Sequence, residues 1–313
     1  METSEKYLRL FILQIEKEKI MQVIPLKSGV MFKQVFSQPY IFNHFVEDVL
    51  DIKFKTDKVH TEYEYPKPIG FVRSCYDLFA EDKEQRVIVE IQHIKEEDFF
   101  DRFLYYHLIS LIEQAGGYRE YEFQQTVYTI VVLTSTPRDG SINFSCAVSD
   151  MNPIDEYGKT IDIYPHRLVF LCPRQINDKT PAKTQEWLRL IEDSLDGKID
   201  NDQYGKPIWQ DIINQIKKRD IDPAILAQLK DEAAWEKAKQ RFTNEGHKEG
   251  RKKGRREGEA NSLILLLETK FSPLSENQKN IIYSLQKEPL KKAMAYIFQA
   301  SSLDEMFSYI KSL

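Results

Sequence analysis

Cysteine, histidine, glycine and proline are all scarce in this chain of 313 residues, which has 3 Cys, 6 His, 12 Gly and 13 Pro. The three cysteines show neither a Cys-x-x-Cys pair nor a Cys/His ligand spacing, which argues against a disulfide scaffold or a zinc ribbon and favours a reducing compartment. So little glycine and proline excludes a collagen-like or low-complexity chain. We expect a globular protein of roughly two domains.

Long apolar runs and a net positive charge are also missing. No stretch approaches the about 18 consecutive apolar residues that a membrane-spanning helix needs, and no export signal is evident near the N-terminus. We therefore expect a cytoplasmic protein without a membrane partner. The formal net charge is -5, which is not typical of a basic nucleic-acid-binding protein.

The segment 241–260 departs from this acidic balance, because seven Lys or Arg against four Glu give it a net charge of +3. Each glycine in a helix costs about 1 kcal/mol relative to alanine. Three interpretations are open: a solvated linker, a linker whose cations contact a DNA backbone, and a helix whose small residues permit tight self-association. The glycines of this segment recur every four residues, as Gly246, Gly250, Gly254 and Gly258.

Hydrophobic patterning in the first half of the chain predicts an α/β fold. Apolar residues recur at helical spacing in some stretches, whereas others are dense in β-branched and aromatic residues. Pro39 is expected to divide the first helical stretch into two helices. The expected elements are helical residues 28–50, strands at 59–65, 72–80 and 86–92, a helix at 96–114 and a strand at 126–134.

This order of elements predicts a mixed sheet flanked by helices. Shorter strands near 142–150, 160–164 and 167–172 would extend the sheet as a meander, and the chain from 184 onward is expected to be helical. The C-terminal helices would form a small interaction bundle, through which copies of the chain would associate as a homo-oligomer. The expected division is an extension at 1–20, a first domain at 21–180, a helical region at 181–240, the basic segment at 241–260 and a helical region at 261–313.

Two acidic residues lie inside apolar strands, Asp77 in CYDLFA and Glu90 in VIVEIQ. A carboxylate is a poor strand residue, and its burial without a partner is costly or shifts its pKa. If the strands form an antiparallel hairpin turning about Lys83 and Glu84, Asp77 lies opposite Glu90 on one face. Because opposed carboxylates repel each other, the hairpin predicts a cation between them, and oxygen ligands favour Mg²⁺ or Mn²⁺.

Two alternatives are open for this hairpin. Glu90 and Gln92 would simply face solvent on an amphipathic strand if Val87, Val89 and Ile91 face the core. A hairpin register shifted by one residue would separate the two acids.

The order of the motifs carries a family resemblance. A VMFKQVF helix, a YDLFA strand, a polar turn, a VEIQ strand, a DRFLYY helix and a VYTI strand follow one another. Over residues 25–173 this order resembles the PD-(D/E)XK nuclease family often labelled transposase, close to the recombination-promoting nucleases. The glycine-spaced segment extends the likeness loosely. The resemblance implies a restriction-endonuclease-like fold and a Mg²⁺-dependent DNA endonuclease, a hydrolase with a role in recombination or mobile elements.

The resemblance also implies roles for individual residues. Asp77 matches the first acid and Glu90 the second, so both would hold the metal ion that activates water for phosphodiester hydrolysis. Gln92 stands where many of these nucleases have a catalytic lysine. Because glutamine carries no charge, the alternative is a weakened enzyme that serves as a DNA- or protein-binding module. A DDE-type transposase is disfavoured, since no third acid lies in a suitable context.

Cationic residues near the motifs are candidates for substrate binding. Lys33 on the first helix and Lys95 just after Gln92 would supply the missing positive charge, or else are solvated lysines. Arg102 and Tyr106 lie four residues apart and share a helix face. They would hold the scissile phosphate or brace the second acid, or else form a surface arginine packed on an aromatic ring.

Three further residues receive less weight. Tyr105 and Gln114 also match the family pattern. His93 is the histidine nearest to the expected site, but no second His or Cys stands at ligand spacing, so we expect a structural role for it.

Overall fold

The computed structural model describes residues 20–65, 74–93, 99–115, 123–137, 140 and 142–313. The chain divides into two compact units, Met1–Glu232 and Ala233–Leu313. Each unit is described by itself. Lys95 lies outside the described residues.

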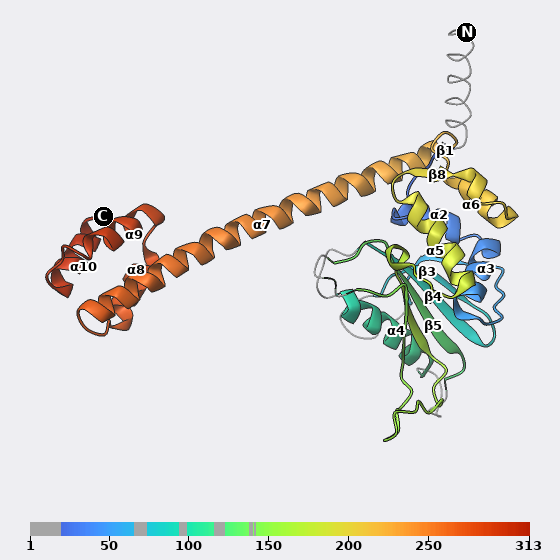
Figure 1. Ribbon diagram of the computed structural model, residues 1–313, viewed down its shortest axis with the longest axis horizontal. Coiled ribbons are helices and arrows are strands. Elements are labelled where there is room, and N and C mark those ends of the chain that lie inside the picture. The colour runs from blue at the N-terminus through green and yellow to red at the C-terminus, as the bar shows by residue number, and fades with distance from the viewer. Residues whose placement is uncertain (1–19, 66–73, 94–98, 116–122, 138–139, 141) are drawn as a thin grey trace, which may run out of the picture. The chain divides into compact units, whose positions relative to one another are not determined.

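A mixed six-stranded sheet forms the centre of the first unit (Figure 1). The strand order is β2-β3-β4-β5-β7-β6, in which β4, β5 and β7 are parallel and the other adjacent pairs are antiparallel. The α/β fold class predicted from the sequence is thereby confirmed. The strands are β2 (His60–Tyr63), β3 (Tyr76–Glu81), β4 (Gln85–Gln92), β5 (Thr126–Leu133), β6 (Cys146–Asp150) and β7 (Arg167–Leu171).

Helices cover both faces of this sheet (Figure 1). Side chains alternate along each strand, so Leu78 and Val89 pack with one group of helices while Phe79 and Ile88 pack with Ile109 on the other face. The first group is α2 (Gly29–Phe36), α3 (Pro39–Leu50), α5 (Ala182–Ser194) and α6 (Pro207–Ile216), and the opposite face is covered by α4 (Phe99–Ala115).

Local sequence signals separate α2 from α3. The hydroxyl of Ser28 accepts the N–H of Met31 at 3.3 Å and caps the start of α2. Pro39 occupies the first turn of α3, where its missing N–H has no helical partner to lose. The predicted break at Pro39 is confirmed.

The hairpin of β3 and β4 has the register that the sequence predicts. Leu78 pairs with Val89, as required for Asp77 to reach Glu90. In the turn, the carboxylate of Asp82 accepts the N–H groups of the two residues that follow Lys83, at 2.8 and 2.7 Å. The alternative register shifted by one residue is therefore wrong.

Two predictions for the later strands are wrong. Residues 160–164 form no strand in the described structure, where a single isolated bridge joins Ile154 to Thr160. The strands also do not follow a meander, because β7 lies between β5 and β6 and runs parallel to β5. The physical reason is burial: four of the five residues of β7 are buried, as suits an inner strand, whereas β6 is half-exposed at the edge.

The first unit continues past residue 180, where the switch to a helical sequence pattern predicts a domain boundary. Trp187 of α5 and Trp209 of α6 are buried in the same core as α2 and α3, with their ring centroids 4.5 Å apart. A second, two-stranded sheet joins β1 (Ile20–Gln22) to β8 (Lys198–Asp200). Strands of three residues are too short to give a periodic signal, so the sequence does not predict this sheet.

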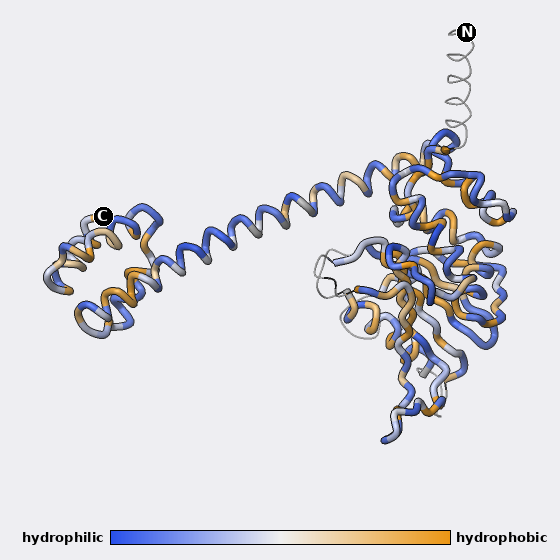
Figure 2. Tube along the Cα trace, viewed as in Figure 1, coloured by the Kyte–Doolittle hydropathy of each residue, from blue (hydrophilic) through white to orange (hydrophobic). Residues whose placement is uncertain are grey.

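The second unit is helical, as expected. Figure 2 shows hydrophobic residues concentrated in its C-terminal helices and hydrophilic residues along the middle of α7. The segment 241–260 lies within α7, so it is helical and not a loose linker. Contact of its cations with a DNA backbone stays a prediction. None of the described helices, α7 included, is both long and apolar enough to cross a membrane. The helices of the second unit are the part of α7 (Pro223–Lys270) from Ala233 onward, α8 (Glu276–Ser284), α9 (Lys287–Tyr296) and α10 (Leu303–Ser312), whereas the first turns of α7 belong to the first unit.

Candidate active site

Asp77 and Glu90 lie side by side where β3 and β4 part. Regular pairing of the two strands ends at Leu78 and Val89. Beyond that point the N–H of Asp77 donates to Oε1 of Glu90 at 3.0 Å, and the N–H of Ile91 donates to Oδ2 of Asp77 at 3.0 Å. Each carboxylate accepts a backbone N–H of the opposite strand, so the hairpin itself holds the two acids together.

Both carboxyl groups are largely removed from solvent, and Glu90 is only 4% exposed. Burial raises the pKa of Glu90 well above its usual value, and the negative charge of Asp77 raises it further. Burial also raises the pKa of Asp77, against the opposing effects of the Ile91 N–H and of the charges of Lys33 and Arg102. A bound cation would favour the ionised form of both acids, against the effect of burial. The solvent-facing alternative for Glu90 is wrong.

Lys33 approaches the acids from α2, on one face of the sheet. Its Nζ donates to Oε1 of Glu62 at 2.6 Å, and its side chain is 19% exposed. Burial acts to lower the pKa of Lys33, but the hydrogen bond to Glu62 and the charges of Asp77, Glu62 and Glu232 outweigh that effect and raise it. Lys33 is thus a charged, ion-paired lysine close enough to influence Asp77.

Arg102 approaches from α4, on the other face of the sheet. Its Nη2 donates to Oε1 of Gln92, and its guanidinium lies 4.7 Å from the centroid of the Phe103 ring. The amide of Gln92 donates in turn to the carbonyl of His93 at 3.0 Å. Gln92 is therefore held by a cation from the neighbouring helix, and Arg102 places a positive charge beside this uncharged side chain.

Tyr106 borders Glu90 one helical turn beyond Arg102. Its ring packs edge-on against Tyr76, with the centroids 5.4 Å apart. Burial raises the pKa of the Tyr106 hydroxyl, and the charge of Glu90 raises it further, whereas Arg102 lowers it. The structure therefore brings Arg102 and Tyr106 to the same acid. The aromatic ring on which the arginine packs is Phe103, its neighbour in sequence.

The three candidates with the least support from the sequence, Gln114, Tyr105 and His93, make contacts elsewhere than at Asp77 and Glu90. Gln114 makes two hydrogen bonds to the backbone of Gln125, at 2.8 and 3.2 Å, and fastens the end of α4 to the start of β5. Tyr105 packs near Tyr106, with the ring centroids 6.4 Å apart. His93 Nδ1 lies 3.3 Å from the hydroxyl of Thr134.

Two acidic residues beside the site were not predicted. Glu62 has a positive φ of 52° within β2 and pairs with Lys33. Glu232, near the start of α7, accepts the N–H of Gly29 at 2.7 Å and the hydroxyl of Ser28, so it caps the helix that carries Lys33. The capping role of Glu232 could not be predicted from the neighbouring sequence, because Glu232 lies 203 residues from Gly29.

The donor set of the pair fits a hard divalent cation. No three His, Cys, Asp or Glu side chains converge on a metal position among the described residues. Mg²⁺ commonly takes only one or two carboxylates from the protein, while water and substrate phosphate complete its coordination. Asp77 and Glu90 provide these two carboxylates, and burial raises the pKa of both groups despite the nearby charges of Lys33 and Arg102.

Glu90→Gln is expected to raise the melting temperature of the metal-free protein by a few degrees near pH 8. Gln keeps the oxygen that accepts the Asp77 N–H but removes a buried charge. The gain should vanish below about pH 3, well under the ordinary glutamate pKa, because Glu90 then carries a proton in both the folded and the unfolded chain. The gain in melting temperature should grow as the pH rises from the ordinary glutamate pKa to the raised pKa of Glu90 in the folded state. Thermal melts in EDTA across this range measure it.

The matched control is Glu84→Gln, an exposed glutamate in the turn of the same hairpin, which should leave the melting temperature nearly unchanged. Added Mg²⁺ should stabilise the wild type more than Glu90→Gln. A variant less stable than the wild type near pH 8 in EDTA would contradict an uncompensated charge on Glu90.

Comparisons with protein-family models, with characterised proteins and with solved structures found no match. The chemistry of the site is accordingly inferred from the positions, burial and charges of its own side chains.

Proposed function

We propose that the protein is a divalent-metal-dependent DNA endonuclease that hydrolyses phosphodiester bonds at Asp77 and Glu90. One observation carries this proposal: a half-buried and a fully buried carboxylate from adjacent strands converge at a point approached by a cation from each face of the sheet. The motif order of the PD-(D/E)XK family agrees with it. A cytoplasmic location and a role in recombination or mobile elements belong to the same proposal.

The residues of the site divide the work of hydrolysis. Asp77 and Glu90 would hold Mg²⁺ or Mn²⁺, which supplies an activated water and neutralises charge that develops on the phosphate. Lys33 lowers the pKa of Asp77, so it favours the ionised form that a metal requires. Arg102, fixed on Gln92 and Phe103, offers a guanidinium that can pair with a phosphate oxygen.

A binding module without cleavage activity is the second candidate, and the uncharged Gln92 favours it. The two functions separate in a nicking assay on supercoiled plasmid with Mg²⁺, Mn²⁺ or EDTA. We expect the purified wild type to nick the plasmid with either metal and to be inactive in EDTA. DNA binding without nicking under any metal would support the binding module and contradict the endonuclease.

Lys33→Gln is expected to reduce nicking on the order of 10-fold near neutral pH. Loss of the positive charge raises the pKa of Asp77 further, because Lys33 in the wild type lowers that pKa. The acidic limb of the pH profile should therefore move to higher pH, and raised pH should recover part of the activity. The exposed Lys53 provides the control Lys53→Gln. An unshifted pH profile in Lys33→Gln would show that this lysine does not act on Asp77.

A further inference from the structure

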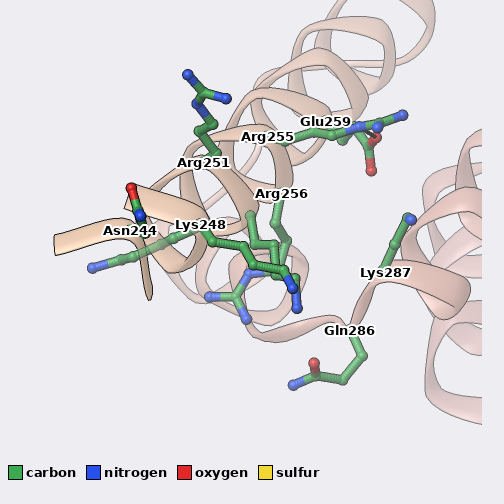
Figure 3. A pocket seen from close by; sticks show the side chains of 10 residues that line it. Asn244, Lys248, Arg251, Arg255, Arg256, Glu259, Gln286 and Lys287 are labelled. Carbon is green, nitrogen blue, oxygen red and sulfur yellow. Dashed lines mark hydrogen bonds and ion pairs between the residues drawn. The ribbon is translucent and has the colours of Figure 1, made fainter. Parts of the chain in front are cut away.

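The middle of α7 presents a cationic face within the second unit. Most of its side chains recur three, four or seven residues apart, a spacing that places them on one side of a helix. Gln286 and Lys287, at the start of α9, stand across from them (Figure 3). The open groove between them, called here the basic groove, has a volume of about 1090 Å³. It is lined by Asn244, Lys248, Arg251, Lys252, Lys253, Arg255, Arg256, Glu259, Gln286 and Lys287.

Positive charge dominates the basic groove. Glu259 is the one acid among the lining residues, and its Oε1 accepts from Nε of Arg255 at 3.0 Å. Lys253 lies 4.0 Å from Glu257. Within the described part of the chain no acidic partner is found for the other lining cations, which are Lys248, Arg251, Lys252, Arg256 and Lys287. Five cations without an ion pair thus surround one groove, and this concentration of positive charge favours a polyanion.

The far side of the same helical segment carries the glycines. In the described structure nothing lies within 4 Å of a Cβ built on any of the four. A basic helix that lies on a membrane needs an apolar stripe beside its charges. Between residues 246 and 258 glycines take that place, and the exposed Phe242 is a single aromatic residue, so the segment has charge for a polyanion but no apolar stripe for a bilayer.

We propose that the basic groove binds the phosphodiester backbone of a nucleic acid. Three of the lining cations are arginines, whose planar guanidinium groups match phosphate oxygens in pairs. Such contacts release counterions and depend little on base sequence. This binding site lies in the second unit and requires neither a divalent metal nor the carboxylates of Asp77 and Glu90, so it does not depend on the proposed cleavage activity.

The test measures binding of a fluorescein-labelled duplex of mixed sequence, as DNA and as RNA, by anisotropy in EDTA over a series of salt concentrations. The groove variant combines Arg251→Ala, Lys252→Ala, Arg255→Ala and Arg256→Ala, and alanine is the best helix former. The control variant replaces four exposed cations outside α7 with alanine, namely Lys218, Arg219, Lys292 and Lys311. Circular dichroism checks that both variants keep their helix content.

The groove variant should lose affinity on the order of 100-fold at 0.1 M salt, and its log–log salt slope should fall by about 3 to 4. The control variant should keep most of the wild-type affinity. Binding of either duplex in this pattern supports the proposal. Equal losses in the two variants, or an unchanged slope in the groove variant, would overturn it. Tighter wild-type binding to phosphatidylserine vesicles than to both duplexes would overturn it in favour of a membrane.

Discussion

Asp77→Asn and Glu90→Gln should each reduce metal-dependent nicking of supercoiled plasmid by at least about 100-fold. Each substitution is isosteric and retains an oxygen that can accept the backbone N–H now bound by the carboxylate. The hairpin should therefore keep its geometry while one of two negative charges is lost. Initial nicking rates with saturating Mg²⁺ and with Mn²⁺ give the measurement.

Glu84→Gln supplies the matched control, because it changes the same functional group in the exposed turn of the same hairpin. Its nicking rate should equal that of the wild type. Glu90→Gln is expected to nick at least about 100-fold more slowly and yet to be more heat-stable, a combination that general damage to the fold does not produce. Wild-type nicking rates in both site variants would assign the activity to another site or to a contaminant.

Trp187→Ala should destabilise the first unit by about 3–5 kcal/mol. The Trp187 ring is fully buried and packs edge-on against Phe45 and Trp209, with centroid distances of 5.2 and 4.5 Å. Its Nε1 also donates to Oδ2 of Asp48 at 2.9 Å, a bond that alanine cannot replace. Denaturant unfolding followed by circular dichroism measures the loss.

Trp235→Ala is the control, since the Trp235 side chain in α7 is 72% exposed. Its cost should stay within about 0.5 kcal/mol. Similar stabilities for the two variants would mean that α5 does not share the core of the sheet, and that the first unit ends near residue 180.

The site's central hairpin could be predicted because its signals are local. Side chains alternate along a strand, and the polar turn after Glu81 fixes the pairing, so two acids in apolar strands had to share one face. The break at Pro39 and the helical face of Arg102 and Tyr106 follow from equally short-range rules.

The partners of the acids could not be predicted in the same way, because they depend on tertiary packing. Nothing near Lys33 in the sequence indicates that it reaches Glu62, or that Glu232 caps its helix from 203 residues away. The contact between Arg102 and Gln92 likewise requires α4 to be packed on the sheet. The position of β7 inside the sheet reflects burial on both faces, which the length of its apolar run only suggests.

Whether the paired carboxylates bind a divalent cation is most directly tested by Mn²⁺ anomalous scattering from crystals of the wild type soaked near pH 8. A single anomalous peak should lie between Asp77 and Glu90, within about 2.0–2.3 Å of one oxygen of each, and should be absent from Glu90→Gln crystals soaked in the same way. Fully ionised but unoccupied carboxylates at saturating Mn²⁺ would contradict a metal-dependent active site at this hairpin.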